Sequence, residues 1–271
     1  MTSAPEPHPT TRAALLLEYD GTAYAGWQSQ GTLPEGLATI QGVLEQAAAK
    51  LARGVRVPVT VAGRTDAGVH AEGQVAMFDL PGAWAPDKLR DALNFHLKPH
   101  PIVVLRAAAA PEGWNPRFSA IGRAYRFRIL NRRARPALLL NRAWHVERPL
   151  DVDAMHAAAQ TLLGRHDFTS FRAAACQAKS PLRTLDRLDV TRQGEIIEIE
   201  ADARSFLHHQ VRNMVGTLKL VGEGRWPVAR VAEALAARHR AAAGPTAPPE
   251  GLSLVAVRYT VDVFPDGAGG G

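Results

Sequence analysis

The chain has 271 residues, of which 46% are hydrophobic and 21% charged, an ordinary globular composition. Its single cysteine, Cys176, excludes an internal disulfide and a cysteine-based zinc centre, and no apolar run reaches the roughly 18 residues of a membrane span. Lys and Arg exceed Asp and Glu by 32 to 26, a balance compatible with a polyanionic partner. Met1 to Thr10 lacks a basic start followed by an apolar run, so we expect no secretory signal and a cytoplasmic protein without a membrane partner.

The first half of the chain alternates strands and helices after a lead, residues 1–10, that we expect to be disordered. We predict strands over Ala13–Tyr19, Arg56–Val61, Val75–Leu80 and Ile102–Arg106 from their apolar or β-branched character. A loop from Asp20 to Gln30 follows the first strand. Apolar residues at helical spacing predict a helix with Ile40, Val43, Leu44, Ala47 and Leu51 on one face, and Pro86–Phe95 is also predicted to be helical.

The second half of the chain also alternates predicted strands and helices. Charged and apolar side chains alternate over Arg123–Leu130, which predicts a strand with Tyr125, Phe127 and Ile129 on one face. Asp151–Leu163 is predicted to be a helix capped by Asp151 or Asp153, and residues 183–192 and 195–203 a hairpin turning at Gln193-Gly194. The remaining predictions are a long helix with the stripe Leu207, Val211, Met214, Val215 and Leu218, a helix after Pro227 with the stripe Val228, Val231, Ala232 and Leu235, and a closing strand over Leu252–Val263.

This order of elements predicts an α+β fold of two similar halves that join near residues 108–115. We expect an N-terminal half over 11–110 that carries the loop Gly63–His70, a C-terminal half over 111–264, and a flexible tail over 265–271. Each half should contain a largely antiparallel, mixed sheet with helices on one face.

Arginines crowd into one short segment around Tyr125 and Phe127, a mixture that suits phosphate contact and base stacking. They are Arg123, Arg126, Arg128, Arg132, Arg133 and Arg135.

The segment Gly63–His70 connects two predicted strands and contains Arg64, Thr65 and Asp66 between glycines. In an extended stretch, residues two apart point the same way, so Arg64 and Asp66 could share one cleft, where the guanidinium would favour the ionised carboxylate. A well-formed turn with no chemical role is the other interpretation, because Asp before a glycine-containing turn is common. The spacing does not fit a phosphate-binding loop of the Gly-x-x-x-x-Gly-Lys-Ser/Thr type.

Gly63-Arg64-Thr65-Asp66-Ala67-Gly68-Val69-His70-Ala71 resembles the signature of the TruA-type tRNA pseudouridine synthases. Further blocks resemble the same family in the same order over roughly residues 12 to 264. They include Glu18-Tyr19-Asp20-Gly21-Thr22, Gly26-Trp27-Gln28, Arg117-Phe118-Ser119-Ala120, Arg123-Ala124-Tyr125-Arg126-Phe127, Gly164-Arg165-His166-Asp167-Phe168, Phe206 to Gly216, and Ala247-Pro248 with Gly251-Leu252.

The resemblance implies a cofactor-free isomerisation of uridine to pseudouridine at positions 38, 39 and 40 of tRNA, in the anticodon arm. It implies that Asp66 is the catalytic carboxylate, that Tyr125 and Leu252 line the pocket for the extruded base, and that Arg212 pairs with the carboxylate. Arg64 is a further substrate-binding candidate. The family also implies an RNA cleft between the halves and a homodimer.

Some alternatives stay open at this stage. A non-catalytic tRNA-binding protein on the same fold is the main one, and a glycoside hydrolase lacks an evident second carboxylate beside Asp66. Tyr125 could be a core residue and Arg212 a solvated charge. His208 and His209 are predicted to lie on a helix and to point apart, so we expect no metal site there.

Overall fold

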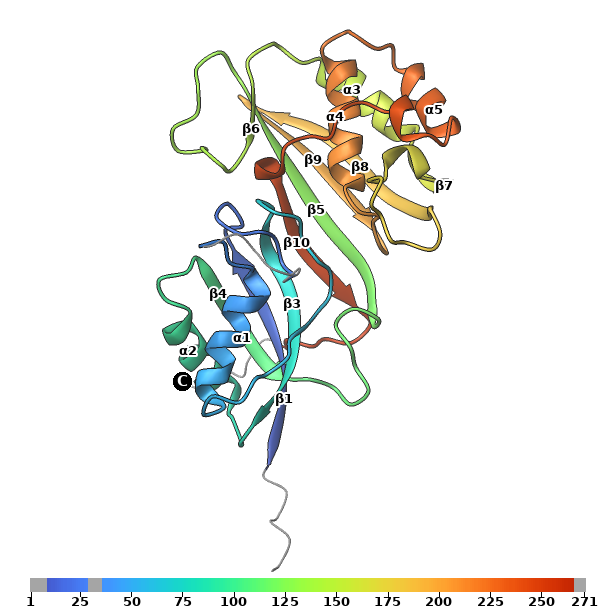
Figure 1. Cartoon of the computed structure of the whole chain (residues 1–271). Coiled ribbons are helices and arrows are strands. Elements are labelled where there is room, and N and C mark those ends of the chain that lie inside the picture. Colours follow the sequence, from blue (N-terminus) through green and yellow to red (C-terminus); the bar gives the residue numbers. More distant parts are fainter. Residues whose placement is uncertain (1–8, 29–35, 266–271) are drawn as a thin grey trace, which may run out of the picture. The chain divides into compact units, whose positions relative to one another are not determined.

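The structure is a computed structural model that describes residues 9–28 and 36–265 (Figure 1). The chain packs into two compact units. Unit 1 takes in the chain up to Ala67, Ala71–Ala120, and the C-terminal segment from Val257, and unit 2 takes in Gly68–His70 and Ile121–Ala256. Most of the expected lead, part of the expected loop over 20–30 and nearly all of the expected tail lie outside the described residues. The ranges 11–110 and 111–264 stay a prediction.

Unit 1 is built on an antiparallel sheet in which β1 (Thr10–Tyr19) lies between β3 (His70–Pro81) and β4 (Ile102–Ala109). The short β2 (Thr60–Val61) pairs with β3. Helices α1 (Ile40–Leu51) and α2 (Pro86–Leu97) contact each other, and α2 also contacts β4. The Thr39 hydroxyl caps α1 by accepting from the Gly42 amide at 3.1 Å.

Unit 2 contains a sheet in the order β5-β9-β8-β7, with every pair antiparallel, and β6 adds to β5 in parallel. These strands are β5 (Ala120–Asn131), β6 (Trp144–Val146), β7 (Gly164–Asp167), β8 (Leu182–Gln193) and β9 (Ile196–Ala203). Three helices pack with them: α3 (Val152–Gln160), α4 (Gln210–Gly222) and α5 (Ala229–Ala236). Strand β10 (Leu252–Tyr259) begins in unit 2 and ends in unit 1.

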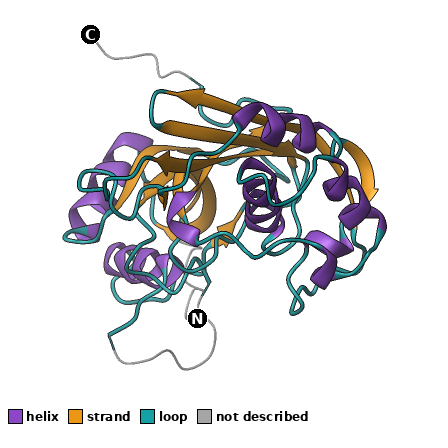
Figure 2. Ribbon diagram, turned by 90° about the horizontal axis from the view of Figure 1, so that it is seen from above, coloured by secondary structure: helices purple, strands orange, loops and turns teal. Residues whose placement is uncertain are grey.

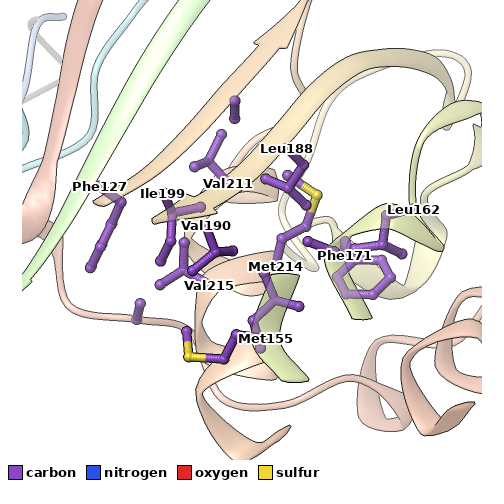
Figure 3. Close-up of a cluster of buried hydrophobic side chains, with 14 of the residues drawn as sticks. Phe127, Met155, Leu162, Phe171, Leu188, Val190, Ile199, Val211, Met214 and Val215 are labelled. Carbon is purple, nitrogen blue, oxygen red and sulfur yellow. The ribbon is translucent and has the colours of Figure 1, made fainter. Parts of the chain in front are cut away.

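The core of unit 2 lies between its sheet and its helices. Figure 3 shows Phe127 and Ile199 from the strands facing Val211, Met214 and Val215 of α4. Tyr125 packs at the margin of this cluster, while Phe127 and Ile129 are fully buried, so the predicted alternation of β5 is confirmed.

The α+β class and the largely antiparallel, mixed pairing are confirmed (Figure 2). The expected RNA cleft between the halves stays a prediction. Among the described residues, no helix is long and apolar enough to cross a membrane.

Five element predictions are wrong in detail. Only Thr60 and Val61 of the expected strand 56–61 pair, because Pro58 has no amide and the Val59 amide donates to the Glu45 side chain at 3.2 Å. Strand β10 stops at Tyr259, four residues early, and strand β1 starts at Thr10, inside the expected lead. In α5 the buried stripe is Val231, Ala234 and Leu235, and Ala232 is exposed.

The fifth concerns the long helix, which begins at Gln210 and not near Leu207. His209 adopts a left-handed conformation with φ 62°, which a helix cannot continue through. His208 and His209 therefore precede the helix. Their rings lie 4.0 Å apart at 43°, so the prediction that they point apart is wrong. The expectation that they bind no metal ion stays a prediction.

Candidate active site

Asp66 lies on an irregular segment between β2 and β3. Arg64 is exposed, Thr65 is buried, and Asp66 is half-buried. This alternation is expected for an extended stretch, in which neighbouring side chains point to opposite sides. Thr65 therefore anchors the segment inward, while the side chains on either side of it stay accessible.

Three hydrogen bonds inside unit 1 hold this segment. The Thr65 carbonyl accepts from the Trp27 amide at 3.0 Å, and the Thr65 hydroxyl lies 2.8 Å from the Tyr19 hydroxyl. The Gly63 carbonyl accepts from the Gln74 amide group at 2.7 Å. Buried polar groups that are fully paired fix one geometry, so the backbone on the N-terminal side of Asp66 is firmly held.

The Tyr19–Thr65 hydrogen bond belongs to a network that includes Gln74. The Gln74 Nε2 also donates to the Tyr19 oxygen at 3.3 Å, and the Gln74 Oε1 accepts from the Val75 amide. The Tyr19 hydroxyl therefore bonds to both Thr65 Oγ1 and Gln74 Nε2. Burial raises the pKa of Tyr19 to about 12, so this phenol stays protonated at neutral pH.

Gly26 packs against the backbone of the same segment. Its φ is +93°, and a Cβ added there would lie 2.7 Å from the Thr65 carbonyl oxygen and 3.0 Å from the Ala67 nitrogen. Only glycine fits this conformation and this approach. The Gly26 carbonyl then accepts from the Ile40 amide at the start of α1, so the block Gly26-Trp27 links the Asp66 segment to the helix.

The C-terminal end of the segment, Gly68–His70, packs within unit 2 against the turn Pro249–Gly251. A Cβ on Gly68 would lie 2.8 Å from Pro249 Cγ, and the His70 ring nitrogen Nε2 lies 3.2 Å from the Glu250 carbonyl oxygen. Leu252 follows this turn directly and is buried. The two residues that precede the block Gly251-Leu252 are thus in contact with the end of the signature loop.

Tyr125 lies in the middle of β5, opposite Ala201 of β9, and is half-buried. Its ring meets that of Phe206 edge to face at 5.2 Å. An aromatic ring that is held on one side and partly accessible on the other suits stacking on a base.

Arg212 projects from the first turns of α4 and is half-buried. Its Nε donates to the Ala247 carbonyl at 2.8 Å, and its own carbonyl accepts from the Ala247 amide at 3.0 Å. The neighbouring helix residue Gly216 lets this segment lie directly on α4, since a Cβ there would be 1.8 Å from the Pro245 carbonyl oxygen. The Arg212 side chain is therefore fixed near its end by a backbone contact.

Asp66 and Arg64 thus belong to unit 1, and Tyr125, Arg212 and Leu252 belong to unit 2. Reasoning from sequence missed the residues that hold the Asp66 segment, Tyr19, Gln74 and Gly26. Two of them lie in blocks of the resemblance, and Gln74 could have been noticed as an amide at the start of the apolar run Val75–Leu80.

The sheets, their helices and the hydrogen-bonded loop that carries Asp66 define an α+β protein with a candidate catalytic carboxylate, and comparison with known proteins gives the family. The family model described as "tRNA pseudouridine synthase" matches residues 15–119 and 158–260. The chain is 68% identical to tRNA pseudouridine synthase A of Acidiphilium cryptum, over 94% of this chain and 98% of that protein. It is 56% identical to the enzyme of the same name from Gluconobacter oxydans, over 96% and 94%.

The chain therefore belongs to the tRNA pseudouridine synthase family. It is an isomerase that converts uridine to pseudouridine in tRNA.

Proposed function

We propose that this enzyme modifies uridine at positions 38, 39 and 40 in the anticodon arm of tRNA, with Asp66 as the catalytic carboxylate. The reaction breaks the bond from uracil N1 to the ribose and forms one from C5; the hydrogen on C5 leaves as a proton, and N1 takes up a proton. Tyr125, Leu252, Arg64 and Arg212 contact the substrate. No cofactor is needed in this scheme, because the bonds broken and formed balance without an oxidant or reductant.

The observation that carries the role of Asp66 is the way its segment is held. Thr65 is buried and hydrogen-bonded by Tyr19, whereas Asp66 beside it is half-exposed. A plain surface turn would not require a buried phenol, a buried amide and a glycine at φ +93° beneath it. Such support is what a catalytic group needs to hold its geometry.

We also propose that the enzyme is a cytoplasmic homodimer, as the family resemblance implies. The net charge of +6 is compatible with the tRNA partner. Sedimentation equilibrium tests the assembly: the expected mass is twice the 29.2 kDa of one chain, and a mass of one chain at micromolar concentration would contradict it.

Release of tritium from tRNA labelled at uridine C5 tests the activity. Wild-type protein should release label from transcripts that carry uridine at position 38, 39 or 40, and not from transcripts with cytidine at all three. Asp66→Asn keeps the size of the side chain and should lower kcat by about a thousandfold or more, with tRNA affinity nearly unchanged.

The same assay distinguishes the proposed enzyme from the non-catalytic tRNA-binding protein. A tRNA-binding protein on this fold would bind the transcripts and release no label from any of them. If label is released but Asp66→Asn releases it at the wild-type rate, the family activity stands and the assignment of Asp66 is wrong.

A further inference from the structure

A groove of about 660 Å³ lies in unit 2 at the end of β5, distinct from the positions of Tyr125 and Arg212. It is lined by Asn131, Arg132, Arg133, Glu147, Arg148, Pro149 and Arg192. Its four arginines and one glutamate give the lining a formal charge of +3. Arginines around an open groove are suited to phosphate, because the guanidinium donates several hydrogen bonds in a fixed plane.

The floor of the groove is rigid. Asn131 is buried, and its Nδ2 donates to the carbonyls of Val146 at 2.9 Å and Arg148 at 2.7 Å. Its Oδ1 accepts from the Leu150 amide and from Arg192, whose guanidinium also donates to the Leu150 carbonyl at 3.0 Å. One buried amide thus joins β5, the segment after β6, and β8, so the arginines stand on a prearranged frame.

Two of the arginines have side chains without a partner in the described part of the chain. Arg132 is paired with Glu195 at 2.8 Å. By contrast, within residues 9–28 and 36–265 the side chains of Arg133 and Arg148 make no ion pair or hydrogen bond, and both are exposed. An unpaired, exposed guanidinium loses little solvation on meeting an anion, so these two are the strongest phosphate donors of the groove.

Other arginines of the same sequence cluster already have partners within the protein. Arg126 and Arg128 form ion pairs with Glu198 across the β5–β9 pairing, and Arg123 is buried and donates to the Arg204 carbonyl at 2.6 Å. For these three arginines the expectation of phosphate contact stays a prediction, and they would have to leave partners inside the protein to meet it. The phosphate-binding capacity of the segment is concentrated beyond residue 131.

We propose that this groove binds the phosphodiester backbone of the tRNA substrate through Arg133 and Arg148. Asn131 follows Tyr125 by six residues on β5, so the groove begins roughly 20 Å along the strand from the tyrosine. That length corresponds to about six stacked nucleotides at ~3.4 Å each, within one arm of a tRNA. The inference rests on the proposed function, because the RNA it names is the substrate of that reaction.

The test compares tRNA binding by wild-type protein and by the Arg133→Gln/Arg148→Gln variant over a range of KCl concentrations. Loss of two phosphate contacts should weaken binding about tenfold at 0.1 M salt and make the dependence of log Kd on log salt shallower by about 1 to 2. The KM for tRNA in the tritium-release assay should rise along with the Kd.

The matched control is Lys88→Gln/Arg90→Gln on α2, which removes the same charge. Arg90 is already paired with Asp87 and Asp91, so this variant should bind within about twofold of wild type. Equal weakening by both variants, or an unchanged affinity and salt dependence in the groove variant, overturns the proposal. If the double variant is less stable than wild type, Arg133→Gln alone tests the same contact, because Arg133 is an exposed loop residue. Wild-type protein that binds tRNA but releases no tritium would refute the proposed function and leave the groove assignment standing.

Discussion

The Tyr19 hydroxyl lies 2.8 Å from the Thr65 hydroxyl, with both residues buried, next to the half-exposed Asp66. Gln74 completes the network by donating to the Tyr19 oxygen and to the Gly63 carbonyl. The phenol thus links β1 to the segment that carries the proposed catalytic carboxylate. Tyr19 touches no reacting atom in this scheme and is a positioning residue.

Tyr19→Phe should reduce turnover more than it reduces substrate binding. The change removes the hydroxyl and leaves Thr65 Oγ1 without its hydrogen-bond partner, at a cost of about 1–2 kcal/mol in the free energy of unfolding. A looser Asp66 should lower kcat roughly tenfold, because catalysis depends on the placement of the carboxylate, while KM for tRNA changes little. Tritium release at saturating and at limiting tRNA measures the two quantities.

Tyr24→Phe is the matched control for this variant. Tyr24 is also buried in unit 1, and its hydroxyl lies 3.0 Å from the His100 Nδ1. Its loss should destabilise the protein by a similar amount without lowering kcat. Equal kcat in the two variants would show that Tyr19 contributes to stability alone.

The raised pKa of Tyr19 predicts how stability depends on alkaline pH. The folded pKa is about 12 and the ordinary pKa of a tyrosine is 10.0, so the unfolded chain releases this proton first as pH rises. The stabilisation is fully present below pH 10 and is lost between pH 10 and 12, by about 2–3 kcal/mol for a shift of this size.

Urea unfolding of wild type and Tyr19→Phe at pH 8 and pH 11 isolates this group, because all other titrations are shared. Wild type should be the more stable at pH 8, and its advantage should shrink or reverse at pH 11. A constant difference between the two proteins across this range would rule out a buried, neutral Tyr19.

Gly26→Ala should be strongly destabilising through one close contact. The new Cβ would lie 2.7 Å from the Thr65 carbonyl oxygen at a φ of +93°. Gly54→Ala is the control, since Gly54 has a similar φ of +87° with nothing within 4 Å of an added Cβ. We expect a loss of about 1–2 kcal/mol for Gly54→Ala and about 2 kcal/mol more for Gly26→Ala, with reduced kcat only in the latter. Equal losses in urea unfolding would mean that the Thr65 contact is unimportant.

Much of the fold could be predicted because its elements follow local rules. Helix α1 shows its apolar spacing, Asp151 caps α3 by accepting from the Ala154 amide at 2.9 Å, and the β8–β9 hairpin turns at Gly194. One of the errors occurred where a distant contact overrides local preference. The Val59 amide is taken by Glu45, fourteen residues away, which no strand pattern reveals.

The candidate site shows the same difference between local sequence signals and distant contacts. Asp66, Tyr125 and Arg212 could be named from their sequence blocks, because those blocks resemble one family. The support beneath Asp66 could not, since it depends on Tyr19 and Gln74 coming together from strands 55 residues apart in sequence. The sequence also could not predict that Arg133 and Arg148 lack a carboxylate partner among the described residues, because only the fold shows which arginines form ion pairs.

Gly216→Ala should disturb unit 2 by displacing the segment that fixes Arg212. A Cβ on this α4 residue would lie 1.8 Å from the Pro245 carbonyl oxygen, so residues 245–247 must move away and the Arg212–Ala247 hydrogen bonds are lost. We expect a loss of about 3–5 kcal/mol in urea unfolding, together with a reduced kcat for tritium release. Gly42→Ala in α1 meets only the Thr39 hydroxyl at 3.1 Å and should stay within about 1 kcal/mol of wild type, because alanine favours the helix. Matching stabilities for the two alanine variants would show that residues 245–247 do not rest on α4.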